Sequence, residues 1–313
     1  MSSQRDTFLL GLLEEAKKDD KIKLLSIDMG APSLDAWRSE LPKQFMPMGI
    51  SEQNAINFGA GLASRGYKVY AYTMACWAAR CFEQVRYSCA MAQLPLTLVG
   101  TGVGLGYVHS GAAHNPTEDI AYMRSLVGIE IDSPVNSNAT KALVKLTVNQ
   151  PKLRYIRLER VFDKSLESLH PMIDFNISRG MDWVHRSAKD CIVTSGYMMH
   201  RVLKVRELLK EREGIDIAVV DLWRVKPIDR QIFFQTFYDY EKIITVEEQT
   251  LSGGFGSAVC EMICDLSWNK KVLRMGLDER YIFENGTRDQ LLDNNGLSIE
   301  SLYENILKFV RSK

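Results

Sequence analysis

The sequence predicts two α/β domains in series, each built around a largely parallel β-sheet. The chain has 313 residues, which is about the length of two domains of ordinary size. Apolar, strand-like stretches alternate with stretches of helical period, a pattern typical of βαβ units. The alternation is interrupted in one segment, residues 166–187, where charged residues of both signs are mixed and no helical or strand period is clear. We therefore expect a first domain over residues 1–165, a linker over 166–187 and a second domain over 188–313.

The first domain is expected to begin with an amphipathic helix at residues 6–18 and an apolar strand at 23–28. Ser51 is a favourable N-cap and Gly66 lies where a helix often ends on glycine, so a helix is expected over 51–66. The remaining elements are expected as a strand at 67–74, a helix at 77–93, and strands at 94–99, 127–131 and 153–159, with a helix between the last two.

The second domain is expected to repeat the alternation of strands and helices. Its expected strands are 191–195, 216–222 and 242–247, and its expected helices are 198–213, 230–238, 256–267, 288–293 and 298–310. In parallel sheets, ligands bind at the carboxyl ends of the strands. The loops that follow the strands are therefore expected to hold the functional residues.

Composition excludes several classes of function. The 39 Lys and Arg balance 39 Asp and Glu, which argues against nucleic-acid or anionic-membrane partners. No apolar run approaches the roughly 18–20 residues that span a bilayer. The N-terminal segment lacks a small-residue cleavage site, which favours a helix over a signal peptide. Six cysteines without a CxxC pair or histidine cluster favour buried thiols in the cytoplasm over a zinc site.

Two glycine-rich segments are weak candidates for phosphate binding. Residues 100–106 follow a strand, but they lack the Lys-Ser/Thr of a Walker loop and the GxGxxG register of a dinucleotide fold. Residues 253–256 precede a helix, whose N-terminus could bind an anion. The sequence favours a close backbone approach at the first segment and a tight turn at the second.

Glu52 and His114 are the most informative polar residues. Glu52 opens a helix of small and apolar residues, where an acid favours the positive end of the helix dipole. The alternative is a close-packed contact at which the carboxyl hydrogen-bonds a bound molecule, and the pattern alone leaves both open. His114 lies in a polar loop after residues 100–106, where it could contact a substrate or simply be solvated.

Several motifs in order point to one family. They are GISEQNAINFGAGLA at 49–63, RCFEQVR at 80–86, His114 followed by EDIAYMR at 118–124, YIRLER at 155–160, LWRVKPID at 222–229, VEE at 246–248 and SGGFGS at 252–257. With these motifs, nearly the whole chain resembles the C-terminal half of transketolase, as found in split transketolases made of two polypeptides. The implied folds are a pyrimidine-binding domain and a C-terminal domain of largely structural role.

The resemblance implies thiamine diphosphate as the cofactor. Glu52 corresponds to the glutamate that hydrogen-bonds a ring nitrogen of the aminopyrimidine and so promotes removal of the proton from the thiazolium carbon. Trp77 takes the place of a phenylalanine that stacks on the pyrimidine, and Arg80 is expected beside the cofactor. Glu52 and His114 are the expected catalytic residues.

The resemblance also implies a sugar-phosphate substrate, with Arg160 binding the phosphate and Ser26, Ser110 and His114 lining the pocket. Two positions depart from the family. Ser110 replaces an aspartate that contacts the donor's hydroxyl, and Gly102 replaces a histidine. Both changes remove polar contacts, so we expect a modified sugar rather than a common pentose phosphate.

A missing motif implies a partner. The family binds Mg²⁺ through a GDG motif and a later Asn, oxygen ligands suited to this cation, and no GDG occurs in the sequence. A GDG-containing N-terminal subunit is therefore expected to supply the metal ligands, most simply in a heterotetramer of two plus two. The small residues Gly59, Ala60 and Gly61 fit a close contact with it.

The expected function is transfer of a two-carbon ketol unit between a ketose and an aldose. One alternative is the beta subunit of a 2-oxo acid dehydrogenase, which has the same pair of domains. Another is a non-catalytic partner subunit that has kept the fold. The motifs at 80–86 and 118–124 are transketolase-like, and a purely structural chain would not need Glu52.

Overall fold

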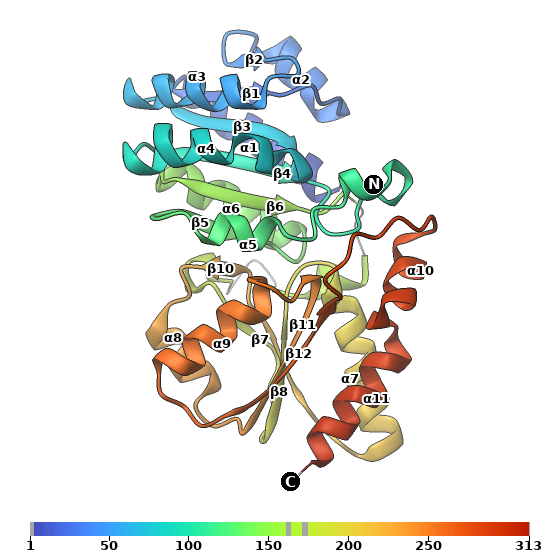
Figure 1. The fold of residues 1–313 in the computed structure, drawn as a ribbon. Coiled ribbons are helices and arrows are strands. Elements are labelled where there is room, and N and C mark those ends of the chain that lie inside the picture. The colour runs from blue at the N-terminus through green and yellow to red at the C-terminus, as the bar shows by residue number, and fades with distance from the viewer. Residues whose placement is uncertain (1–2, 161–163, 171–174, 313) are drawn as a thin grey trace.

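The computed structural model describes residues 3–160, 164–170 and 175–312. Within these ranges it contains two β-sheets in two stacked domains, with the long helix α11 (Ile299–Arg311) along one side of the second domain (Figure 1). The larger sheet has the strand order β10-β5-β6-β4-β3-β1-β2, and the smaller has the order β12-β11-β8-β9-β7. The predicted fold class of two α/β domains in series is confirmed.

The strands follow the predicted order, with four additions. Those of the first domain are β1 (Ile22–Ser26), β2 (Phe45–Pro47), β3 (Lys68–Met74), β4 (Leu96–Thr101), β5 (Glu130–Asp132) and β6 (Arg154–Leu158). The rest are β7 (Asp182–His185), β8 (Asp190–Thr194), β9 (Ala218–Asp221), β10 (Arg224–Lys226), β11 (Lys242–Thr250) and β12 (Lys271–Leu277). The strands β2, β7, β10 and β12 were not predicted from the sequence.

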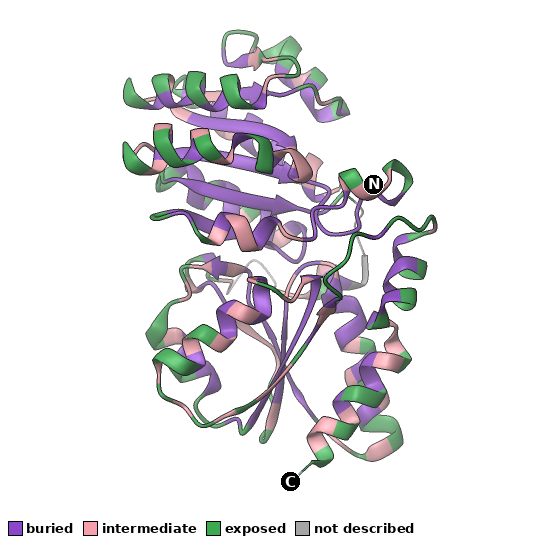
Figure 2. Ribbon diagram, viewed as in Figure 1, coloured by how far each residue is buried: buried purple, intermediate pink, exposed green. Residues whose placement is uncertain are grey.

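The α-helices cover both faces of each sheet. In the first domain they are α1 (Gln4–Ala16), α2 (Pro32–Glu40), α3 (Glu52–Ser64), α4 (Phe82–Gln84), α5 (Asp119–Arg124) and α6 (Ser137–Asn149). In the second they are α7 (Met198–Glu213), α8 (Arg230–Phe237), α9 (Phe255–Asp265), α10 (Arg288–Leu292) and α11. The central strands are almost entirely buried, the edge strands β7 and β12 are partly exposed, and the outer faces of the helices are exposed (Figure 2). Within the described residues, no helix is both long and apolar enough to cross a membrane.

The helix predicted at residues 77–93 is wrong in detail. The chain instead forms a 3₁₀ helix η1 (Ala75–Cys81), the single turn α4 and a π-helix η2 (Val85–Met91). The tight first turn follows directly from β3, and its face toward the core is formed by Ala75, Ala78 and Cys81. Short side chains on this face let the backbone lie close to the sheet. This arrangement places Trp77 and Arg80 at the edge of the sheet.

Each sheet has one antiparallel strand, which the prediction of parallel sheets did not include. β7 lies inside the segment expected to be a linker and pairs with β9. β10 belongs by sequence to the second domain but pairs with β5 of the first sheet. The Arg224 Nε donates to Asp132 at 3.0 Å, and this buried ion pair fixes the crossing strand.

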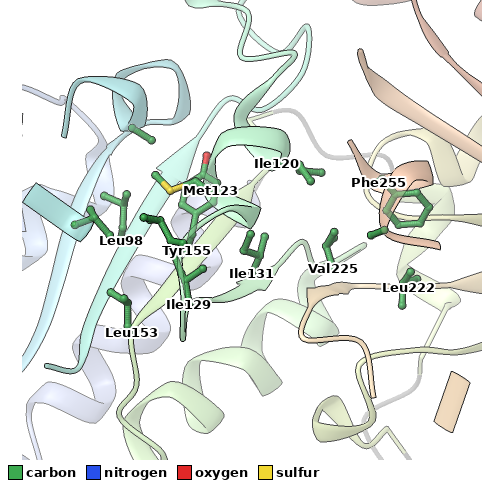
Figure 3. Packing of buried hydrophobic residues seen from close by; sticks show 14 of the residues in the cluster. Leu98, Ile120, Met123, Ile129, Ile131, Leu153, Tyr155, Leu222, Val225 and Phe255 are labelled. Carbon is green, nitrogen blue, oxygen red and sulfur yellow. The ribbon is translucent and has the colours of Figure 1, made fainter. Parts of the chain in front are cut away.

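The hydrophobic core continues from one domain into the other. One apolar cluster contains Leu98 and Tyr155 of the first sheet together with Leu222, Val225 and Phe255 of the second domain (Figure 3). Two further clusters lie on the opposite faces, one under α1, α2 and α6 and one under α7 and α11. Because one core crosses the boundary, the two domains pack as a continuous body.

Candidate active site

The predicted site residues lie at one edge of the larger sheet. β1, β3, β4 and β6 are parallel, so their carboxyl ends meet at the same edge. Ser26 is the buried last residue of β1 and Trp77 follows β3. His114 lies in the loop after β4, and Arg160 is the second residue after β6. The topology brings together residues that are far apart in the sequence.

Glu52 is the first residue of α3 and is only 4% exposed. The Ser51 hydroxyl, expected to cap this helix, donates instead to the Met48 carbonyl at 2.6 Å. Among the described residues, none donates a hydrogen bond to the Glu52 carboxylate, and Arg80 Nη1 lies 3.6 Å from its Oε2. A buried carboxylate is rarely left without donors. Glu52 is therefore suited to receive a donor from a bound molecule.

The rings of Trp77 and His114 are in direct contact. Their ring centres lie 5.4 Å apart in an edge-to-face arrangement. The His114 Nδ1 lies 3.0 Å from the Ser110 carbonyl oxygen, which can only accept, so this contact requires a proton on Nδ1. The hydrogen bond orients the ring, and it uses the backbone of Ser110 rather than its hydroxyl.

Tyr107, which the sequence analysis did not single out, fills the space beside Gly102. Gly102 has a φ of +76°, and a Cβ there would collide with the Tyr107 ring. The Arg160 guanidinium lies 4.7 Å from the centre of the same ring, within the range of a cation–π contact. An aromatic ring thus lies beside Gly102, the position at which the resemblance implies a histidine in the family, and the same ring contacts the residue expected to bind phosphate.

A pocket of about 300 Å³ opens between the turn after β3 and the His114 loop. Its wall includes Cys76, Asn115 and Tyr122, together with Tyr281 and Phe283 from the second domain. The Asn115 Oδ1 is buried and has no hydrogen-bond partner among the described residues. The pocket is therefore lined in part by aromatic rings, with Asn115 in its wall.

The segment at residues 253–256 is not an open anion site. The Glu247 carboxylate accepts hydrogen bonds from the backbone N–H groups of Phe255 at 2.6 Å and Gly256 at 2.8 Å. Burial raises the pKa of Glu247 to about 8, against the effect of these two N–H donors. An internal carboxyl thus takes the place that a phosphate would need at the N-terminus of α9.

Two of the three small residues expected at a partner contact pack inside the chain instead. A Cβ at Gly59 would lie 2.8 Å from Leu96 and 3.1 Å from both Leu25 and Val69. Ala60 is 5% exposed, whereas Gly61 is exposed. The glycine at position 59 lets α3 approach its own sheet closely, so it is not evidence for a partner.

The part of the chain that the structure describes contains no group of three or more His, Cys, Asp or Glu side chains that could hold a metal ion. Three of the six cysteines are also poorly suited to be ligands. Burial raises the pKa of Cys76, Cys81 and Cys89 to about 12 in each case. Thiols of this kind are inert at neutral pH.

Comparison with known proteins identifies both domains. Residues 2–161 match the family described as Transketolase, pyrimidine binding domain, and residues 183–302 match Transketolase, C-terminal domain. One of the subunits of the apulose-4-phosphate transketolase of Phocaeicola vulgatus is 31% identical over 315 residues, which cover 99% of this chain and 98% of that protein. The 1-deoxy-D-xylulose-5-phosphate synthase of Clostridium perfringens is 27% identical over 97% of this chain and 49% of that enzyme.

One solved structure matches the chain over nearly its whole length. A split gene transketolase, described as an inactive beta4 tetramer, superimposes with a TM-score of 0.87 at 30% identity and covers 98% of both chains. The chain belongs to the transketolase family and contains its pyrimidine-binding and C-terminal domains.

Proposed function

We propose that this chain is the pyrimidine-binding subunit of a two-chain transketolase, which transfers a two-carbon ketol unit from a ketose to an aldose. The observation that carries the proposal is Glu52, a carboxylate at 4% exposure without a hydrogen-bond donor among the described residues. Burying a carboxylate without a hydrogen-bond donor is costly, and the ring nitrogen of an aminopyrimidine would supply a donor once it is protonated. An end of the first domain at residue 165 and a cytoplasmic location are part of this proposal. The second domain begins before the expected residue 188, because β7 (Asp182–His185) pairs with β9 in the second sheet.

The residues around Glu52 fit thiamine diphosphate. When bound, this cofactor supplies an electron sink for the carbon–carbon bond that is broken and formed. Glu52 would hydrogen-bond and exchange a proton with the pyrimidine ring, and the half-buried Trp77 would stack on it. Arg80, 3.6 Å from Glu52 Oε2, would hold the carboxylate in position.

Substrate contacts would come from the loop after β4 and the end of β6. His114, oriented by the Ser110 carbonyl, would hydrogen-bond or exchange a proton with a sugar hydroxyl. Arg160 would bind the phosphate, because an exposed guanidinium suits this dianion. Ser26 and Ser110 would line the substrate site, although neither lies in the wall of the 300 Å³ pocket. Tyr107 beside Gly102 supports a sugar with fewer polar groups at that point than a common pentose phosphate has.

A second chain would complete the site. We expect the Mg²⁺ and diphosphate ligands on a GDG-containing subunit, because the sequence has no GDG motif. Large apolar side chains are unusually exposed on α3, η2 and nearby turns, namely Ile50, Phe58, Tyr87, Met91 and Val127. Apolar surface of this kind typically marks an interface, and a heterotetramer of two plus two would cover it.

The reaction products distinguish a transketolase from a 2-oxo acid dehydrogenase, whose beta subunit has the same pair of domains. We expect the chain, mixed with its GDG-containing partner, Mg²⁺ and thiamine diphosphate, to lengthen an aldose phosphate by two carbons at the expense of a ketose phosphate. Mass spectrometry of the sugars measures this directly. Acyl transfer to a lipoyl acceptor from a 2-oxo acid, without ketol transfer, would contradict the proposal.

Replacing Arg160 with alanine should weaken the binding of phosphorylated sugars selectively. The loss of a charge-assisted contact to phosphate should raise KM by about tenfold or more and change kcat little. Unphosphorylated analogues should show no change. Arg38→Ala, which removes an exposed arginine from α2, is the matched control. An equal rise of KM for both classes of sugar would remove Arg160 from the phosphate role.

A further inference from the structure

A buried cluster of charges joins the C-terminal domain to the end of β6. The Arg288 Nη1 donates to Glu159 Oε2 at 2.7 Å, and its Nε donates to Glu248 Oε1 at 2.8 Å. All three side chains are at most 8% exposed. The Tyr197 ring covers the guanidinium, whose carbon lies 3.7 Å from the ring centre. We call Glu159, Glu248 and Arg288 the Arg288 cluster.

The Arg288 cluster also binds the glycine loop at residues 100–106. The Leu105 N–H donates to Glu248 Oε1 at 3.1 Å, and Arg288 Nη2 donates to the Val103 carbonyl at 3.4 Å. Gly104 has a φ of +55°, and a Cβ there would lie 2.6 Å from Glu248 Oε2. The loop is thus shaped to lie directly against a carboxylate from the other domain.

The same strand of the C-terminal domain binds the next part of the loop. Directly after Glu248 on β11, the Gln249 Nε2 donates to the Pro116 carbonyl at 3.2 Å. The Thr250 N–H donates to the Thr117 carbonyl at 2.9 Å. The C-terminal domain therefore contacts the loop on both sides of His114.

We propose that Arg288 is a positioning residue, through which the C-terminal domain fixes the loop that carries Tyr107, Ser110 and His114. The proposal rests on the function proposed above and extends the largely structural role expected for this domain. Glu159 directly precedes Arg160 in the sequence, so the same cluster also fixes the backbone from which the phosphate-binding side chain extends. The arrangement needs a forked cation, because one guanidinium bonds two carboxylates and a carbonyl.

The placement of the cluster separates two functions of the site. Its contacts reach the loop and the end of β6, whereas Glu52 lies on α3 beside Arg80. Loosening the cluster should therefore disturb the substrate-facing residues and leave the contact of Glu52 with the cofactor in place. Small displacements of positioning groups reduce rates strongly.

The test compares Arg288→Lys with Arg154→Lys. Lysine keeps the charge but cannot replace the fork. Arg154 is 0% exposed and donates a hydrogen bond to Glu130 at the opposite end of β6. The Arg154→Lys variant therefore controls for the loss of a buried guanidinium group elsewhere in the chain. We expect Arg288→Lys to speed amide hydrogen exchange of residues 101–117 by about tenfold or more in the chain alone. Arg154→Lys should leave this segment unchanged.

In the reconstituted enzyme, Arg288→Lys should lower kcat/KM for ketol transfer by about ten- to a hundredfold. Exchange of the thiazolium C2 proton should stay within about twofold of wild type. If Arg288→Lys speeds loop exchange but the wild-type chain reconstituted with its partner shows no ketol transfer, the positioning role would be supported and the proposed function contradicted. The positioning role would be overturned if amide exchange of residues 101–117 is unchanged in Arg288→Lys. It would also be overturned if exchange rises equally in Arg288→Lys and Arg154→Lys along the whole chain.

Discussion

Replacing Glu52 with glutamine should lower kcat for ketol transfer by about 10²–10⁴-fold, the usual scale for loss of a general acid–base group. Glutamine keeps the size of the side chain and can still accept a hydrogen bond, but it cannot exchange a proton with the pyrimidine ring. Because the change is nearly isosteric, the fold and the assembly with the partner should remain. Steady-state kinetics of the reconstituted enzyme, with analytical ultracentrifugation to check assembly, measures both effects.

Glu130→Gln is the matched control for this variant. Glu130 is 5% exposed and lies in β5, where Arg154 Nε donates to it at 2.5 Å. The same substitution there changes a buried carboxylate that the proposed mechanism does not use. We expect kcat within about threefold of wild type. Equal losses of kcat in both variants would show that the Glu52 effect reflects stability, and full activity of Glu52→Gln would exclude its catalytic role.

The chain alone should turn over no sugar and should bind thiamine diphosphate at least about a hundredfold more weakly than the complex does. The reason is that Glu52 and Trp77 contact only the pyrimidine end, whereas the diphosphate needs Mg²⁺ and its ligands. Loss of two charge-assisted contacts accounts for a factor of this size. Calorimetric titration of the cofactor into the chain, the partner and their mixture measures the difference.

Addition of a GDG-containing partner should restore both binding and activity, with the two chains migrating together. A partner whose GDG aspartate is changed to asparagine is the control, because it should assemble without supporting catalysis. Full activity from the isolated chain would contradict the two-chain account. Tight cofactor binding by the isolated chain would contradict it as well.

The regular part of the fold follows from local patterns. The predicted strands have four residues or more, except for β5, whose three residues are all buried. The helices α7 and α11 are long and periodic. β2 and β10 have three residues each, too few for a period to appear. β10 also pairs across the domain boundary, and no local pattern predicts such a partner.

The sequence motifs predict the residues of the candidate site, but they do not predict contacts between residues far apart in the sequence. Glu52, Trp77 and His114 were identified through motifs, and the parallel sheet brings the segments that carry them to one edge. Arg288 meets Glu159 across 129 positions of sequence, so only the structure reveals the contact. Tyr107 was not predicted because its ring occupies the space left by the absent side chain of Gly102, and no sequence motif indicates this contact.

Hydrogen–deuterium exchange at the thiazolium C2 carbon of thiamine diphosphate tests the central claim most directly. The claim is that Glu52 of this chain promotes removal of that proton in a site shared with a second chain. In the reconstituted wild-type complex, exchange should be far faster than in free cofactor, and Glu52→Gln should slow it by about 10²–10⁴-fold. Exchange in the Glu52→Gln complex that is as fast as in wild type would contradict the account.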